Sequence, residues 1–267
     1  MSTNADPAWY NAQYDPRRAD LPMPTIMGNW MERTRAAGLT PVTVAYGDTA
    51  LHTADIYRPA GGGSGFAIFY HGGYWRSCSR HEHGWVAQAY LDQGMSVAIM
   101  DYPLCPDSDL AEIVAATVAA FVFLHRSVMT EAERAHVIVA GHSAGGHLAA
   151  FHRTIDWQQH GLPARPLHGI SALSGIFDLD PLRHTLMNDW LCLTPQSAEA
   201  LSVANKPAVF DVPTVLAVGE LESSEFHRQS RVLAERWPDT TYRSIAGRHH
   251  FDVMDALLTD RALAAPV

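Results

Sequence analysis

Short apolar runs alternate with amphipathic stretches from residue 66 onward. The apolar runs read as strands at 66–70, 96–100, 137–140, 169–173, 214–218 and 241–245, preceded by two β-like runs at 42–46 and 54–57. Apolar positions recur at helical spacing over 109–124, 144–157, 224–237 and 251–263. Strands that alternate with helices predict βαβ units and a mostly parallel sheet flanked by helices.

Two segments depart from this alternation. The first forty residues carry aromatic and Met side chains among Pro and Arg without strand periodicity, which predicts a helical arm over 1–40. The stretch 177–209 fits the strand–helix rhythm poorly and is interpreted as a small cap-like insertion. A glycine-rich patch at 61–65 is too short for a domain linker. We therefore expect one α/β domain over 1–267.

The composition and net charge limit the kinds of binding partner that we expect. The chain is 47% hydrophobic with a formal net charge of -9 and no basic run, which argues against nucleic acid or an anionic membrane. No apolar stretch reads as long enough to cross a bilayer, and the first residues lack the features of a secretory signal. We expect a cytoplasmic protein that acts on a small molecule. The oligomeric state stays open, a homodimer included.

Residues 141–145 read Gly-His-Ser-Ala-Gly, a G-x-S-x-G motif between a predicted strand and a predicted helix. This context indicates a nucleophile elbow, where a serine on a sharp turn between small residues exposes its hydroxyl. The N-terminus of the following helix favours an incoming oxyanion. Ser143 is therefore the candidate nucleophile, and the elbow predicts an α/β-hydrolase fold.

The segment 71–75 reads His-Gly-Gly-Tyr-Trp directly after a predicted strand. In an α/β hydrolase, this loop and the residue after the nucleophile donate backbone N–H groups to the oxyanion. Glycine lets the backbone approach the substrate without a Cβ in the way. We predict that Gly73, Tyr74 and Ala144 form the oxyanion hole.

The catalytic acid should follow the strand that ends at residue 218, and the base should follow the last strand. Glu220, Glu222 and Glu225 compete for the role of acid. Glu225 falls in the first turn of a helix, where negative charge is favoured for structural reasons. Glu222 lies at the loop apex and is our prediction, with Glu220 as the alternative.

Two adjacent histidines, His249 and His250, follow the last strand. Either could reach the nucleophile, and we favour His250 as the base, with the other a solvated loop residue. His81 and His83 alternate without further spaced ligands, so we expect no metal. The three cysteines have no C-x-x-C spacing, which predicts neither a disulfide framework nor a zinc site.

These motifs together resemble the kynurenine formamidase (arylformamidase) branch of α/β hydrolases. The segment 71–75 resembles that family's HGGxW signature, and 141–147 resembles its nucleophile segment. Further similarity lies at 101–106 and in the pair Tyr10–Asn11. The segment 250–252 resembles the catalytic-histidine segment, which selects His250 over His249. Glu222 departs from the family, whose members commonly carry Asp, and 77–85 is unlike the usual segment and is expected to border the pocket.

The resemblance implies hydrolysis of N-formylkynurenine to kynurenine and formate, without a cofactor. A serine mechanism would use Ser143 as nucleophile and His250, oriented by Glu222, as base. Tyr74, Trp75 and Trp190 are candidates for stacking on an aromatic leaving group, with core or cap packing as the alternative for each. Relatives include esterases, so a small-acyl carboxylesterase or an N-acyl-arylamine amidase is the alternative activity. A binding protein on a hydrolase scaffold is disfavoured because no triad or oxyanion position is lost.

Overall fold

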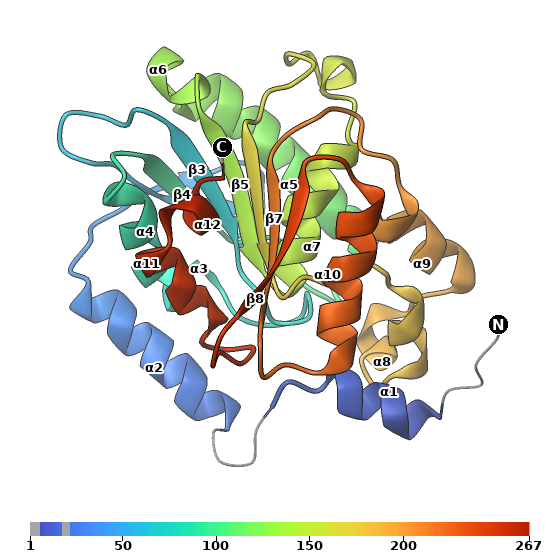
Figure 1. Cartoon of the computed structure of the whole chain (residues 1–267). Helices are drawn as coiled ribbons and strands as arrows, with labels where there is room; N and C mark the ends of the chain where they lie inside the picture. The colour runs from blue at the N-terminus through green and yellow to red at the C-terminus, as the bar shows by residue number, and fades with distance from the viewer. Residues whose placement is uncertain (1–5, 18–21, 267) are drawn as a thin grey trace.

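The computed structural model describes residues 6–17 and 22–266 (Figure 1). One eight-stranded sheet has the order β1-β2-β4-β3-β5-β6-β7-β8. The strands are β1 (Val42–Ala45), β2 (Thr53–Tyr57), β3 (Phe66–Tyr70), β4 (Ser96–Met100), β5 (Val137–His142), β6 (Gly169–Leu173), β7 (Thr214–Gly219) and β8 (Thr240–Ile245). The β1–β2 and β2–β4 pairs are antiparallel and the other pairs are parallel. The predicted mostly parallel sheet is confirmed.

Helices cover both faces of the sheet (Figure 1). On one face lie α5 (Leu110–Phe123), α7 (Ala144–Phe151) and α10 (Ser224–Arg236), whose buried residues share one core cluster. The second cluster draws on α2 (Met23–Ala36), α4 (Ala87–Leu91), α11 (Ala256–Thr259) and α12 (Arg261–Ala264). Shorter helices include α3 (Arg80–His83) and α6 (Glu131–Arg134).

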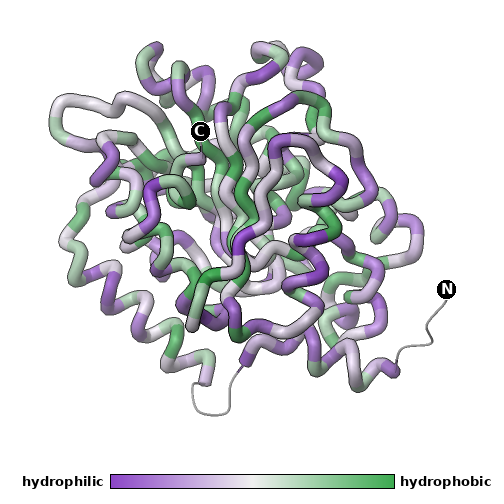
Figure 2. Tube along the Cα trace, viewed as in Figure 1, coloured by the Kyte–Doolittle hydropathy of each residue, from purple (hydrophilic) through white to green (hydrophobic). Residues whose placement is uncertain are grey.

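The central strands are apolar along their whole length because both faces are covered. In β3, Phe66, Ile68 and Tyr70 belong to the first cluster, whereas Ala67 and Phe69 belong to the second. This division follows from the two-residue period of a strand. Figure 2 shows the hydrophobic residues concentrated in these strands. Continuous apolar runs are what a buried parallel sheet requires.

The arm and the cap lie near one another. In the arm, α1 (Pro7–Tyr14) precedes α2, while residues 1–5 and 18–21 of the predicted arm lie outside the described residues. The predicted insertion contains α8 (Asn188–Leu191) and α9 (Pro195–Leu201) between the 3-10 turns Asp180–His184 and Val203–Asn205. Figure 1 places α1 beside α8 and α10.

The last predicted helix, 251–263, is wrong as a single element. The structure has a 3-10 turn (Val253–Asp255), then α11 and α12, separated at Asp260. Asp260 adopts an extended conformation (φ -121°, ψ 99°), and its carboxylate caps α12 at the Leu263 N–H. The other carboxylate oxygen binds Arg243 of β8. A tertiary ion pair and a cap therefore interrupt a helical pattern.

The predicted helix 144–157 also ends early, at Phe151, and continues as a 3-10 turn. A further expectation needs correction, since Leu110–Val128 is long and apolar enough to cross a membrane by length and composition. In the fold, this segment belongs to α5 and the π-helical turn Leu124–Val128. Ile113, Phe121 and other residues of α5 are buried in the first core cluster, so the segment serves as a core helix here.

Candidate active site

Ser143 lies on a sharp turn between β5 and α7. Its backbone has φ 56° and ψ -119°, a region that non-glycine residues rarely adopt and that marks strained functional turns. Two glycines permit the turn. A Cβ on Gly141 would lie 2.1 Å from the Gly145 carbonyl oxygen, and one on Gly145 would lie 2.0 Å from the Tyr70 carbonyl oxygen. Glycine at both positions therefore permits this geometry.

His250 and Glu222 form a buried pair. His250 Nδ1 lies 2.7 Å from Glu222 Oε2, and neither side chain is more than 5% exposed. The second carboxylate oxygen accepts hydrogen bonds from the Gly219 N–H at 2.7 Å and from the Ser174 hydroxyl at 2.5 Å. Because Nδ1 is engaged by the carboxylate, Nε2 is the His250 nitrogen left to exchange a proton.

The two other acidic candidates have structural partners. Glu220 is exposed and accepts a hydrogen bond from the Gly247 N–H at 2.8 Å. Glu225 is buried in the first turn of α10, where it accepts from the Tyr14 hydroxyl at 2.7 Å and from Arg228 at 2.7 and 2.8 Å. Of the three candidate carboxylates, Glu222 is the one bonded to His250.

His249 points to a different partner. Its Nε2 lies 3.4 Å from Asp252, and its Nδ1 accepts a hydrogen bond from the Phe251 N–H at 3.2 Å. The structure thus pairs one of the two adjacent histidines with Glu222 and the other with a nearby aspartate. The local sequence alone did not distinguish these orientations.

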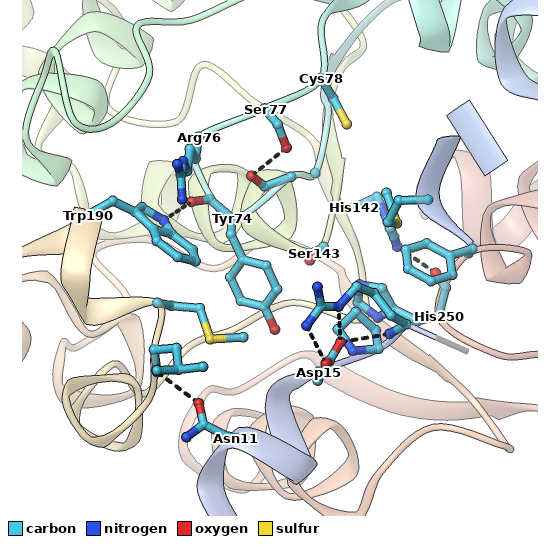
Figure 3. Close-up of a pocket in the computed structure, with 18 of the residues that line it drawn as sticks. Asn11, Asp15, Tyr74, Arg76, Ser77, Cys78, His142, Ser143, Trp190 and His250 are labelled. Carbon is cyan, nitrogen blue, oxygen red and sulfur yellow. Dashed lines mark hydrogen bonds and ion pairs between the residues drawn. The ribbon is translucent and has the colours of Figure 1, made fainter. Parts of the chain in front are cut away.

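Ser143 and His250 line the same cavity, which has a volume of about 520 Å³ (Figure 3). Its walls come from the arm, including α2, and from the loop after β3, the cap and the loop after β8. The lining residues are Asn11, Asp15, Pro16, Arg17, Met23, Trp30, Gly72, Gly73, Tyr74, Arg76, Ser77, Cys78, His142, Ser143, Leu186, Met187, Trp190, His250 and Phe251. The segment expected to border the pocket, 77–85, contributes Ser77 and Cys78.

Tyr74 and Trp190 lie on this cavity, but Trp75 does not. Trp75 is fully buried in the first core cluster and packs edge-on against His147, with ring centroids 5.3 Å apart. We therefore correct the prediction that Trp75 contacts the substrate. Positive φ values of 51° at Tyr74 and 53° at Trp75 turn the loop, and the Trp75 ring points into the core.

The predicted oxyanion donors lie around the nucleophile. Gly73 and Tyr74 share the cavity wall with Ser143, and Ala144 is the first residue of α7. Within the described residues, the N–H groups of Gly73 and Tyr74 donate no hydrogen bond. The Gly73 carbonyl accepts from the Arg76 N–H at 3.0 Å, which closes the turn. These N–H groups are thus available to an oxyanion.

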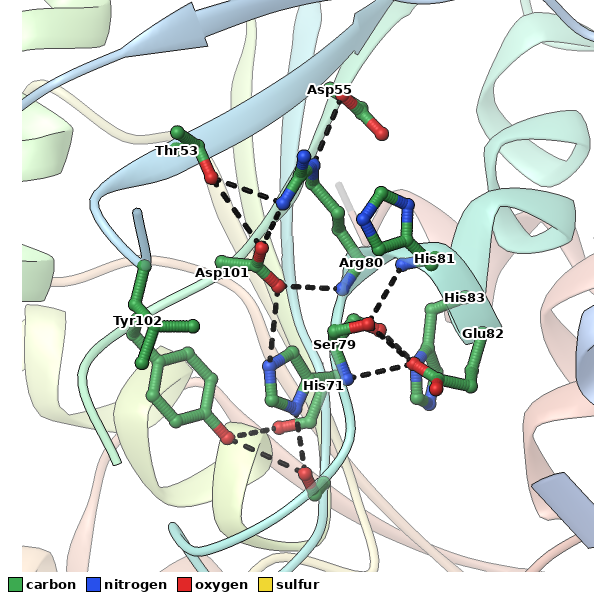
Figure 4. Close-up of polar contacts among 12 residues, drawn as sticks. Thr53, Asp55, His71, Ser79, Arg80, His81, Glu82, His83, Asp101 and Tyr102 are labelled. Carbon is green, nitrogen blue, oxygen red and sulfur yellow. Dashed lines mark hydrogen bonds and ion pairs between the residues drawn. The ribbon is translucent and has the colours of Figure 1, made fainter. Parts of the chain in front are cut away.

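A buried ionic cluster, not foreseen from the sequence, supports the loop 71–75 (Figure 4). The Arg80 guanidinium pairs with Asp101, whose other oxygen accepts from the Arg80 N–H at 2.7 Å and lies 3.9 Å from His71 Nε2. The Tyr102 hydroxyl donates to the His71 carbonyl at 2.7 Å. Burial lowers the pKa of His71 to about 4, so its ring is neutral near pH 7. The cluster fixes the start of the loop.

Two more residues at the site were missed. His142 lines the cavity, and its Nε2 donates to the His250 carbonyl at 2.8 Å. Burial, and then the neighbouring His250, hold the pKa of His142 well below its usual range. Ser174 has φ 50° and binds Glu222. The position of Ser174 directly after a strand was the available signal, because functional residues gather at the carboxyl ends of parallel strands.

The arm contributes a wall that its composition did not suggest. The segment Asp15–Arg17 lines the cavity, and the Tyr74 hydroxyl donates to the Tyr14 carbonyl. Gln13 holds the loop after Glu222, since its carbonyl accepts from the Ser223 hydroxyl at 2.6 Å. The arm therefore bridges the loop that carries Tyr74 and the loop that carries Glu222.

Among residues 6–17 and 22–266, no three His, Cys, Asp or Glu side chains lie close enough together to hold a metal ion. His83 is buried and its Nδ1 lies 2.9 Å from the Ser79 carbonyl, whereas His81 is exposed.

Comparison with known families agrees with this geometry. The family described as alpha/beta hydrolase fold matches residues 67–227, more than half of the chain. The chain belongs to this family. The match begins in β3 and ends in α10, so it spans the loop 71–75, the nucleophile elbow and the Glu222 loop. The predicted fold class is thus confirmed.

Curated relatives of this α/β hydrolase include kynurenine formamidases. The Danio rerio enzyme is 28% identical over 251 residues, covering 87% of this chain and 82% of the relative. The Salmo salar enzyme is 27% identical over 254 residues, covering 88% and 82%. A crystal structure from Silicibacter sp., provisionally named a thioesterase, is 27% identical with a TM-score of 0.83, covering 98% of each chain. The chain is thus an α/β hydrolase that is similar in sequence to kynurenine formamidases.

Proposed function

We propose that this hydrolase cleaves aryl formamides of the N-formylkynurenine type through an acyl-enzyme on Ser143. The observation that carries the proposal is one cavity that holds Ser143 and the Glu222-bonded His250 within walls rich in aromatic and Met side chains. A volume of about 520 Å³ suits a small aromatic molecule. The Danio rerio and Salmo salar relatives are named kynurenine formamidases, and this supports a formamide as the bond that is cleaved.

The proposed reaction proceeds in two halves. His250 Nε2 takes the Ser143 proton as the oxygen attacks the formyl carbon, and the Gly73, Tyr74 and Ala144 N–H groups bind the oxyanion. His250 then protonates the departing aryl amine as the C–N bond breaks. Water, deprotonated by His250, attacks the formyl ester and releases formate and Ser143. Glu222 holds the imidazole in the required tautomer throughout.

The matching experiment compares kcat/KM for N-formylkynurenine, longer N-acylanthranilates and p-nitrophenyl esters in one preparation. The proposal expects the formamide to have the highest value and Ser143→Ala to lose all three activities together. A preference of tenfold or more for the esters would instead support a small-acyl carboxylesterase. Failure of a fluorophosphonate probe to label the wild-type protein would argue against a serine nucleophile.

A further inference from the structure

Arg76 stands on the cavity wall directly after the loop 71–75. Its guanidinium carbon lies 4.5 Å from the centroid of the Trp190 ring, and both side chains line the cavity (Figure 3). The Trp190 indole N–H donates to the Tyr74 carbonyl at 3.4 Å. The Arg76 N–H donates to the Gly73 carbonyl at 3.0 Å. The cation is therefore held on an aromatic platform next to the predicted oxyanion donors.

The two arginines in the described part of the cavity wall differ in their partners. Arg17 forms a two-point ion pair with Asp15, with Nε–Oδ1 at 2.7 Å and a second N–O contact at 2.6 Å. Arg76 contacts no carboxylate among residues 6–17 and 22–266. Most of the remaining wall is apolar or aromatic, in a chain whose formal net charge is -9. Among the described lining residues, the solvent-exposed Arg76 is thus the arginine without a carboxylate partner, and it lies beside a mostly apolar wall.

We propose that Arg76 is a specificity-determining residue that binds a carboxylate on the substrate's leaving group. A guanidinium presents parallel N–H groups that match a carboxylate, and stacking on Trp190 fixes the plane of that fork. The substrate class is then aryl amides or esters whose aromatic amine or alcohol bears a carboxylate. This inference rests on the proposed function for the reacting bond, but the charge preference is measured separately from the bond type.

The test uses substrates that differ in one charge. The formamide pair is 3-formamidobenzoate and 3-formamidobenzamide, and the ester pair is 3-acetoxybenzoate and 3-acetoxybenzamide. Arg76→Gln removes the charge, and Arg231→Gln is the matched control because Arg231 is also exposed and stacked on an aromatic ring, 5.1 Å from the Tyr242 centroid. Arg76→Gln should lower kcat/KM for each carboxylate substrate about ten- to hundredfold, as one charge-assisted hydrogen bond does.

In each pair, the neutral substrate distinguishes binding of a carboxylate by Arg76 from structural support of the cavity wall by Arg76. We expect Arg76→Gln to leave kcat/KM for the benzamides within about twofold, and Arg231→Gln to change none of the four values. An equal fall for charged and neutral substrates would assign Arg76 to packing Trp190 and overturn the inference, as would no fall at all. If wild type cleaves only the esters, the proposed formamidase activity fails, while the ester pair still decides the role of Arg76.

Discussion

Replacing Glu222 by Gln tests the proposed catalytic pair most directly, because the surroundings dictate how the amide would sit. The Gly219 N–H can only donate, and it faces the carboxylate oxygen that does not bind His250. The amide oxygen of Gln would therefore turn toward Gly219, which leaves the NH₂ group facing His250 Nδ1. A donor at that position favours the imidazole tautomer with its proton on Nε2.

With the proton on Nε2, that nitrogen has no lone pair to accept the Ser143 proton, and the remaining lone pair is on Nδ1, which faces the Gln amide. Loss of the correct tautomer lowers kcat by about ten-thousandfold in a comparable triad, which corresponds to about 5.5 kcal/mol of barrier at 1.36 kcal/mol per factor of ten. We expect a loss of this order in Glu222→Gln. The substitution keeps the shape of the side chain, so the fold should survive.

The assay is kcat for N-formylkynurenine and a p-nitrophenyl ester, with folding checked by circular dichroism. Glu220→Gln is the matched control, since it lies two residues away and is exposed, and it should stay within about threefold of wild type. Glu225→Gln should lower the free energy of unfolding by about 1.5–3 kcal/mol, because it weakens buried charge-assisted hydrogen bonds to Tyr14 and Arg228. If Glu222→Gln retained a tenth of wild-type kcat, the tautomer argument would be refuted.

Other outcomes follow from the same geometry. Ser143→Ala should lower kcat about a millionfold without changing the circular dichroism spectrum; residual activity near a tenth would exclude it as the nucleophile. His250→Ala should be nearly inactive and His249→Ala active, and the reverse result would exchange their roles. Burial lowers the pKa of both His71 and His147 to about 4, whereas an unfolded histidine titrates near 6.5. The unfolded chain therefore binds more protons below about pH 6.5, so stability is present above that pH and is lost as pH falls toward 4, by up to about 1.4 kcal/mol per pH unit per histidine. Urea unfolding at several pH values measures this loss, and a free energy of unfolding that stays constant from pH 7 to 5 would contradict it.

The sequence by itself determined the features that depend on neighbours along the chain. The periodicity of strands and helices predicted the sheet because a buried strand and an amphipathic helix each have a characteristic pattern of apolar positions along the sequence. The G-x-S-x-G motif could be recognised in the same way, since Gly141 and Gly145 lie within two residues of Ser143. The expected order of the candidate nucleophile, acid and base follows from the order of the strands, which restricted the choice to a few side chains.

Tertiary structure decided everything that depends on where a side chain turns. Trp75 and Tyr74 are adjacent, yet only the loop's positive φ values send one ring to the core and the other to the cavity. Glu222 is distinguished from Glu220 by its hydrogen bond to His250, which lies 28 positions further along the chain. The arm's place on the cavity wall arises in the same way. No periodic pattern encodes contacts between distant segments, because these form only when packing brings the segments together.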